Sequence, residues 1–267
     1  MKLRFFIIFL PLTIAGCDNS PNLAQLCQEN TEICNDFGKD NWCKVERNNV
    51  SLSRIALKNK PSADIEKFTL LLAYESYIKC MALASQIQHI KLKEKTTMRK
   101  NHLLKAKAHL VALTDETASS EHPHLLYYHW SRTANRTALE KFLALEGSPI
   151  LENAIDQYHL ATYYVKREPK KTLRLLYRSL ELHQPQTELE VETLQTLATI
   201  FTNKKEYKQA YIWLKAYELA QETPDKWVVE TLQQYQQAYQ LDHEFLDEVA
   251  MNTLDNILAG SFTTPRY

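Results

Sequence analysis

The chain has 267 residues, and its 32 basic and 32 acidic side chains leave no formal net charge. This balance excludes the strongly basic composition typical of nucleic-acid-binding proteins, so no nucleic-acid partner is expected. Glycine is scarce, with four residues in the whole chain, whereas the helix-favouring types Leu, Ala, Glu, Lys and Gln are abundant. The composition therefore predicts an all-α protein.

Residues 1–16 have the composition of a secretory signal peptide. Lys2 and Arg4 precede an apolar run from Phe5 to Ala15, which is too short for the roughly 20 residues of a membrane-spanning helix. The run ends in Ile14-Ala15-Gly16-Cys17, which resembles the lipobox of bacterial lipoproteins. A short exported segment that ends in a thiol is thus the first predicted element.

The lipobox resemblance implies a lipid anchor on Cys17. It implies that the chain is cut before this residue, that the sulfur and the new amine are acylated, and that residues 17–22 tether the protein to the periplasmic side of a membrane. Asp18 is similar to the signal that keeps enteric lipoproteins in the inner membrane. The alternative is an unmodified Cys17 in a signal that is cut and discarded.

Four further cysteines form an even set, which suits an oxidising compartment. They are Cys27, Cys34, Cys43 and Cys80. Residues 40–58 and 63–90 are predicted to form helices joined by a turn at Pro61, and folding them back places Cys43 opposite residues 78 to 80. This predicts a Cys43–Cys80 disulfide bond and leaves Cys27 with Cys34.

Two other states of these cysteines remain open. Free buried thiols are one alternative, because spacing does not determine connectivity. A zinc site is disfavoured, since the separations within the set lack the paired short spacings of structural zinc sites. We expect no metal and no cofactor, and we expect residues 23–122 to form an N-terminal helical region held by the two disulfides.

The helix predicted over residues 92–113 has apolar side chains at spacings of three and four and a basic opposite side. The cations of this segment are Lys91, Lys93, Lys95, Arg99, Lys100, Lys105 and Lys107. A solvated helix face is the favoured interpretation, because long cationic side chains cover helix surfaces at little cost. Contact with anionic lipid headgroups or with an acidic partner is the alternative.

From residue 123 to residue 260 the chain repeats itself, with Pro149, Pro185 and Pro224 between pairs of predicted helices. The clearest copy has these matching positions in order: Ala198, Phe201, Ala210, Leu214 and Pro224. This pattern resembles the tetratricopeptide repeat and its Sel1-like relatives, which implies an α-solenoid of antiparallel helix pairs. The pair predicted at 227–239 and 243–259 lacks the signature and is expected to be a cap.

Two adjacent tyrosine pairs, Tyr127 with Tyr128 and Tyr163 with Tyr164, lie on the first helices of successive repeats. In tetratricopeptide arrays these helices line the concave face. Neighbouring residues on a helix point about 100° apart, so both members of a pair cannot face the same packing partner. One tyrosine of each pair is therefore a candidate for a groove that binds peptide or protein, and aromatic core packing is the alternative.

The remaining candidates for chemistry are weak. His122, His124 and His129 could offer imidazoles to a metal, but no carboxylate or thiol completes a ligand set, so solvated loop histidines are predicted. The chain also lacks a Gly-rich phosphate loop, a Gly-x-Ser-x-Gly sequence and a His-Glu-x-x-His sequence. A non-enzymatic protein is expected, and an enzyme that assembles carboxylates from separate helices is the alternative.

The order of these features is similar to an uncharacterised family of gammaproteobacterial lipoproteins, a domain of unknown function. The resemblance rests on the lipobox-like segment, Trp42-Cys43, Tyr127-Tyr128-His129-Trp130 and Ala161-Thr162-Tyr163-Tyr164, and it implies a location and an architecture without an activity. We predict a periplasmic scaffold that binds an unknown envelope protein, with a disordered tail at residues 261–267. An enzyme acting on peptidoglycan or another surface polymer is the alternative function.

Overall fold

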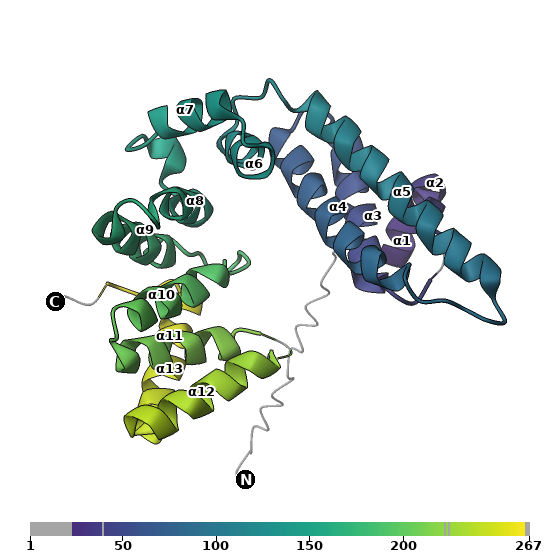
Figure 1. The fold of residues 1–267 in the computed structure, drawn as a ribbon. Coiled ribbons are helices and arrows are strands. Elements are labelled where there is room, and N and C mark those ends of the chain that lie inside the picture. Colours follow the sequence, from purple (N-terminus) through teal and green to yellow (C-terminus); the bar gives the residue numbers. More distant parts are fainter. Residues whose placement is uncertain (1–22, 39, 222, 224, 265–267) are drawn as a thin grey trace, which may run out of the picture. The chain divides into compact units, whose positions relative to one another are not determined.

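The computed structural model describes residues 23–264 except 39, 222 and 224, so residues 1–22 and 265–267 lie outside the described residues (Figure 1). Within the described residues it is all-α, with 13 α-helices, one 3-10 helix and no strand. None of the helices there is long and apolar enough to cross a membrane. The chain divides into two compact units between Glu116 and Thr117, a few residues before the expected boundary at 123.

The first unit is built around α4. Its helices are α1 (Leu23–Glu29), α2 (Thr31–Asn35), α3 (Lys44–Asn59), α4 (Asp64–Ala84) and α5 (Lys93–Glu116). α4 packs against both α3 and α5, and the three run side by side in Figure 1. Because it is flanked by two helices, α4 buries more than half of its circumference, including Phe68, Leu71, Tyr74 and Tyr77. This burial explains why α4 lacks the single apolar stripe of a surface helix.

Two disulfide bonds hold the first unit together. Cys27 of α1 bonds to Cys34 of α2, with 5.6 Å between their Cα atoms. Cys43, which directly precedes α3, bonds to Cys80 of α4, with a Cα separation of 5.8 Å. These are the pairings expected from folding the α3–α4 hairpin about its turn. Both helices are shorter than expected, since α3 begins at Lys44 and α4 ends at Ala84.

Asp40 lies outside α3 because its carboxylate binds Arg99 of α5. The Arg99 Nε atom is 2.5 Å from Asp40 Oδ2, and its Nη1 donates to the Ala84 carbonyl at 3.0 Å. Hydrogen bonding from Arg99 holds the pKa of Asp40 near 2, although burial opposes ionisation. Arg99 is almost fully buried, so its expected place on a solvated helix face is wrong. The Arg99 guanidinium therefore links the segment before α3 to both α4 and α5.

The second unit consists of helices that pack in consecutive pairs. They are α6 (Pro123–Thr133), α7 (Arg136–Ala144), the 3-10 helix Pro149–Leu151, α8 (Ala154–Tyr164), α9 (Pro169–Glu181), α10 (Glu192–Asn203), α11 (Tyr207–Leu219), α12 (Lys226–Tyr239) and α13 (His243–Leu258). α6 packs on α7, α8 on α9 and α10 on α11, while α12 and α13 both cover α11. Asn135, Asn153 and Asp242 cap the starts of α7, α8 and α13.

The apolar core of the second unit extends from helix to helix. One buried cluster runs through α8 to α13 and a second joins α6, α7 and α8. Ala198 and Ala210 are both buried in the first cluster, on the paired helices α10 and α11. Their small side chains let the two helices approach closely, so each helix buries its apolar side against its neighbours.

The C-terminal tail differs from expectation. Residues 261–264 are not a free tail, because the Phe262 ring lies 6.2 Å from Trp213 and 6.5 Å from Tyr177 in the core. The Thr264 hydroxyl donates to Glu181 Oε1 at 2.6 Å. Gly260 makes the turn possible, since its φ of +66° favours glycine and an added Cβ would lie 3.2 Å from Pro185. The sequence missed this contact because a single aromatic has no periodicity.

Candidate functional site

The four predicted partner-binding tyrosines lie on α6 and α8 of the second unit. Tyr128 and Tyr164 are buried, at 3% and 8% exposure, whereas Tyr127 and Tyr163 are half-buried. The Tyr164 hydroxyl donates to Glu146 Oε2 at 2.6 Å, which gives it a structural role. Tyr127 and Tyr163 therefore remain as the candidates for contact with a partner, one from each pair.

A row of aromatic rings connects these two tyrosines, and we call it the aromatic row: Tyr127, Trp130 and Tyr163. The ring of Trp130 lies 5.6 Å from Tyr127 and 5.5 Å from Tyr163, in edge-to-face geometry. The Arg167 guanidinium lies over the Tyr163 ring at 4.3 Å. All three rings are half-buried. Their exposed edges and the Arg167 guanidinium can therefore contact a partner at the surface of α6 and α8.

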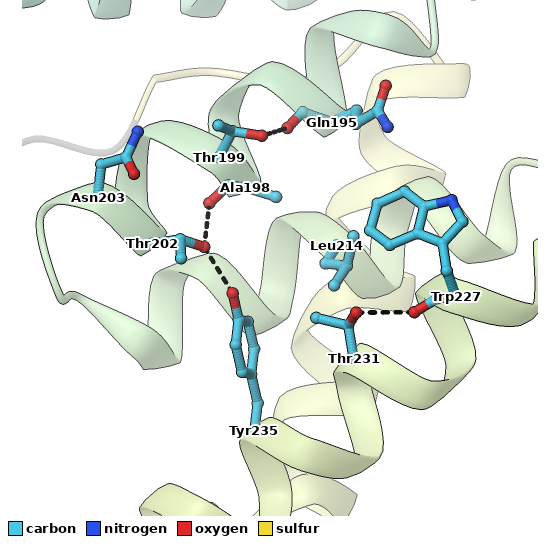
Figure 2. Close-up of a pocket in the computed structure, with 9 residues that line it drawn as sticks. All are labelled: Gln195, Ala198, Thr199, Thr202, Asn203, Leu214, Trp227, Thr231 and Tyr235. Carbon is cyan, nitrogen blue, oxygen red and sulfur yellow. Dashed lines mark hydrogen bonds between the residues drawn. The ribbon is translucent and has the colours of Figure 1, made fainter.

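Further along the second unit, an open cavity of about 160 Å³ lies between α10, α11 and α12 (Figure 2). We call it the α10–α12 cavity. Its lining residues are Gln195, Ala198, Thr199, Thr202, Asn203, Leu214, Trp227, Thr231 and Tyr235. The polar members repeat every four residues, as Gln195, Thr199 and Asn203 on α10, so they share one helix face.

The lining of the α10–α12 cavity combines hydroxyl, amide and aromatic groups. Thr202 donates to the Ala198 carbonyl at 2.8 Å and also bonds to the Tyr235 hydroxyl at 2.7 Å, as Figure 2 shows. The side-chain amides of Gln195 and Asn203 form no hydrogen bond with any residue that the structure describes. None of the lining residues is charged. The cavity can therefore accept neutral hydrogen-bonding and apolar groups, but its lining offers no carboxyl or imidazole for acid–base chemistry.

The sequence reasoning did not single out this cavity. Its signal was present as two runs with four-residue spacing, Gln195-Thr199-Asn203 on α10 and Trp227-Thr231-Tyr235 on α12. Each run places its members on one side of a helix. The spacing by itself does not reveal that the two runs face the same space, because that depends on how α12 packs on α11.

The prediction of solvated loop histidines is wrong for two of the three residues, while His122 is half-buried before α6. His124 and His129 are buried, because α6 begins at Pro123 and turns both side chains inward. His129 Nε2 lies 3.1 Å from the Thr117 hydroxyl. His124 Nε2 lies 3.4 Å from Asp156 Oδ1, and His159 Nδ1 of α8 lies 3.6 Å from the same oxygen.

These imidazoles set the ionisation of Asp156. Burial opposes ionisation of this carboxyl, but hydrogen bonding to His124, His159 and Asn153 outweighs it, so the pKa of Asp156 lies well below its ordinary value. Burial lowers the pKa of His159 to about 4, despite the adjacent carboxylate. The Tyr127 ring stacks on the His159 ring, with 3.6 Å between the ring centroids. The buried His159 therefore supports the aromatic row through Tyr127.

A raised carboxyl pKa occurs at the connection between α9 and α10. Burial, together with hydrogen bonding to Glu192, raises the pKa of Glu190 to about 8. Such a carboxyl holds its proton at neutral pH, which a catalytic acid also requires. Neither Glu190 nor Glu192 is among the residues that line the α10–α12 cavity.

The predicted cysteine sites lie in the first unit or outside the described residues. Cys17, the predicted lipidation site, lies outside them. The described residues contain one group with potential metal-ligand atoms close together, namely Cys43, Glu46 and Cys80. Both sulfur atoms of this group are joined in a disulfide bond, so they offer no thiolate.

Comparison with known proteins identifies a family. A family model described as "Protein of unknown function (DUF2989)" matches residues 14–215, which is most of the chain. The match begins within the lipobox-like segment and ends in α11. Neither the curated proteins nor the solved structures contain a match.

Proposed function

The chain belongs to this family of unknown function, DUF2989, and we propose that it is a lipid-anchored periplasmic protein that holds a protein partner on its second unit. In this proposal Cys17 carries the lipid and the partner is an envelope protein. The second unit acts as a non-enzymatic scaffold, an α-solenoid of antiparallel helix pairs similar to tetratricopeptide and Sel1-like arrays. Asp18 favours the inner membrane as the site of anchoring.

The observation that carries the scaffold proposal is the chemistry of the α10–α12 cavity. It is open, it is lined by hydroxyl, amide and aromatic groups, and its lining contains no charged side chain. In most glycoside hydrolases a pair of carboxyl groups flanks the glycosidic bond that is cleaved. A protein-binding groove needs aromatic anchors and adaptable hydrogen-bonding groups, which Trp227, Gln195 and Asn203 supply.

The proposal includes the aromatic row as a second contact surface on the second unit. Tyr127, Trp130 and Tyr163 lie on α6 and α8, the helices that precede α10 in the same succession of pairs. Aromatic side chains contribute large contact areas and lose little conformational entropy on binding. We therefore propose that the partner contributes an apolar or aromatic segment, with neutral hydrogen-bonding groups that meet the free amides.

The test places a photo-crosslinking amino acid in the cavity, in intact cells. Asn203 and Thr199 are exposed lining positions, and Met251 on α13 is the matched exposed control outside the cavity. We expect both lining positions to cross-link to the same envelope protein and the control position to give no such product. The scaffold proposal fails if the three positions give the same products or if no product repeats.

A second arm measures affinity for the protein captured in this way. Trp227→Ala removes a ring that is 44% exposed, so it should leave the melting temperature nearly unchanged and weaken binding by at least about 30-fold, the loss typical of a binding hot spot. Phe245→Ala removes a ring that is 60% exposed on α13 and should leave the affinity unchanged. Equal effects of the two substitutions would contradict the assignment of the cavity as the groove.

An enzyme acting on peptidoglycan or another envelope polymer is the alternative function. The observation in its favour is Glu190, because a carboxyl with a pKa of about 8 can donate a proton at neutral pH. The enzyme hypothesis predicts that purified protein releases soluble fragments from peptidoglycan and that Glu190→Gln abolishes this release. The scaffold hypothesis predicts no release by either protein.

A further inference from the structure

The outer face of α5 exposes apolar side chains that no neighbour covers. Ile90 and Leu92, in the connection before α5, are 89% and 52% exposed. On α5 itself, Leu104 and Val111 are 65% and 59% exposed. Single exposed apolar residues are common on protein surfaces, but four along one segment of the first unit form a candidate interaction surface.

Lysines lie on the same side of α5 as Leu104 and Val111. At 100° per residue, Lys93, Lys100, Leu104, Lys107 and Val111 fall within an arc of about 60°. The helix buries its opposite side, where Arg99, Ala106 and Leu113 enter the core. The exposed stripe therefore mixes apolar and cationic side chains, which is typical of helices that lie in a membrane interface.

The structure separates the lysines of this segment into two groups. Lys95 and Lys105 lie beside Asp40 and Asp36, within the first unit. Lys93, Lys100 and Lys107 make no ion pair with any residue that the structure describes, so their charge is available to an external anion. The exposed acidic residues of α5 are Glu94, which directly follows Lys93, and Asp115 and Glu116 at the C-terminal end, where Glu116 pairs with Lys67.

The connection before α5 is held in place. The Thr96 hydroxyl donates to the Ile87 carbonyl at 3.1 Å and accepts a hydrogen bond from the His89 backbone nitrogen at 3.3 Å. In Figure 1 this connection runs out to the N-terminal tip of α5. These contacts hold the connection to the first turn of α5, and Ile90 and Leu92 of the same connection are exposed.

We infer that the stripe formed by Ile90, Leu92, Lys93, Lys100, Leu104, Lys107 and Val111 binds the surface of an anionic phospholipid bilayer. The four apolar side chains insert among the headgroups, and the lysines contact lipid phosphates. Lysine side chains suit this role, because their aliphatic stems lie along apolar surface while the ammonium groups reach the phosphates. The surface would act as a second membrane contact in addition to the acyl chains.

This inference rests on the proposed lipid anchor for its biological setting. Leu23 begins the first unit, and six residue steps separate it from Cys17, so an extended tether spans at most about 20 Å. Acylation of Cys17 would hold the first unit within that distance of the bilayer. A weak contact then becomes effective, because tethering raises the local concentration of the surface.

The test uses the chain from residue 18 to residue 267, which lacks the acylated cysteine and retains both units and both disulfide bonds. Co-sedimentation is measured with vesicles of phosphatidylethanolamine and phosphatidylglycerol and with vesicles of phosphatidylcholine. We expect binding to the anionic vesicles that weakens as salt is raised, and much weaker binding to the neutral ones. Equal binding to both vesicle types would contradict the role of the lysines.

Two variants and their matched controls assign the binding to the stripe. The triple variant Lys93→Gln/Lys100→Gln/Lys107→Gln should lower the partition coefficient on anionic vesicles by about 100-fold at low salt, at about 1 kcal/mol per lysine. Lys166→Gln/Lys170→Gln/Lys208→Gln removes three exposed lysines of the second unit and should have little effect. Leu104→Ser/Val111→Ser should lower the coefficient by at least about tenfold, and Phe245→Ser/Met251→Ser on α13 should not.

The outcomes separate this inference from the proposed anchor. Absence of vesicle binding by the chain without Cys17 overturns the inference, whether or not Cys17 is acylated in cells. Binding that depends on the stripe supports it even if Cys17 proves unmodified, in which case the anchor proposal fails. Self-association lost in Leu104→Ser/Val111→Ser, with no vesicle binding, would assign the stripe to a second copy and overturn the inference.

Discussion

Glu190 is a residue whose ionisation should change stability with pH. Its pKa is raised to about 8 by burial and by Glu192, from an ordinary value of 4.5. A carboxyl with a raised pKa in the folded state contributes stability that is fully present below its unfolded pKa and is lost as pH rises through the folded pKa. The loss should therefore develop between about pH 4.5 and pH 8.

Glu190→Gln should remove this pH dependence, because glutamine stays neutral throughout. At pH 8 the variant should be more stable than the wild type by roughly 1 to 3 kcal/mol, and near pH 4.5 the two should be alike. Urea unfolding at the two pH values measures the difference. Glu188→Gln, at an exposed neighbouring position, is the control, and a similar gain in that variant would contradict the role of burial at Glu190.

At the same scale, adjacent tyrosines have different roles. Tyr164 is buried against Glu146 and Lys171, while Tyr163 lies in the aromatic row beside Trp130. The 100° rotation between neighbours on a helix requires this difference. Which tyrosine of the pair turns inward depends on where α7 and α9 lie. The spacing of residues along α8 gives no information about these positions.

At the scale of elements, the Cys43–Cys80 disulfide should contribute more stability than the Cys27–Cys34 disulfide. The two bonds close separations of 37 and 7 residues. In the chain-entropy account, the longer loop is worth about 4 kcal/mol and the shorter one about 2.5 kcal/mol, because the longer constraint removes more freedom from the unfolded chain.

Double substitutions test this order directly. Cys43→Ala/Cys80→Ala should lower the free energy of unfolding of the first unit by more than Cys27→Ala/Cys34→Ala does, as measured by denaturant unfolding under oxidising conditions. Each variant serves as the control for the other, since each removes one bond and two sulfur atoms. The reverse order would mean that strain or residual structure in the unfolded chain outweighs loop length.

The hairpin of α3 and α4 shows which features of a helix pair can be predicted from the sequence. The turn at Pro61 and the two apolar patterns were sufficient to place Cys43 opposite Cys80, because helix geometry fixes the register of a short hairpin. The helix ends were less predictable. Asp40 leaves the expected helix because Arg99, 59 residues later in the chain, binds its carboxylate.

At the scale of the whole molecule, Cys17→Ser tests the anchor. Without the thiol, diacylation and the cleavage that follows it cannot occur, so the chain should remain uncut or become soluble. Detergent-phase partitioning and gel mobility of the protein from cells measure both outcomes. A serine variant that still partitions into detergent at the mature size would contradict the lipobox interpretation, and Cys34→Ser is the control for replacing a cysteine outside the lipobox-like segment.

The sequence by itself determined the helical class, the packing of consecutive helices in pairs and the disulfide register, because each follows from local spacing. Residue propensity and periodicity act over one or two turns of helix, and a hairpin adds one short connection to them. The sequence also pointed to the second unit as the place of a partner surface, through Tyr127, Tyr128, Tyr163 and Tyr164, and that surface stays a prediction. These features needed no knowledge of distant contacts.

The tertiary structure decided which side chains of the predicted helices are buried and which face solvent. It buried Arg99 and His124, packed Phe262 against the core, brought the α10 and α12 runs to one cavity, and left the outer face of α5 uncovered. Each outcome depends on which helix packs against a given face, and partners far apart in the chain supply that face. Burial is a property of the packed unit, so local periodicity can show that a helix has two faces but cannot tell which groups outside it will cover them.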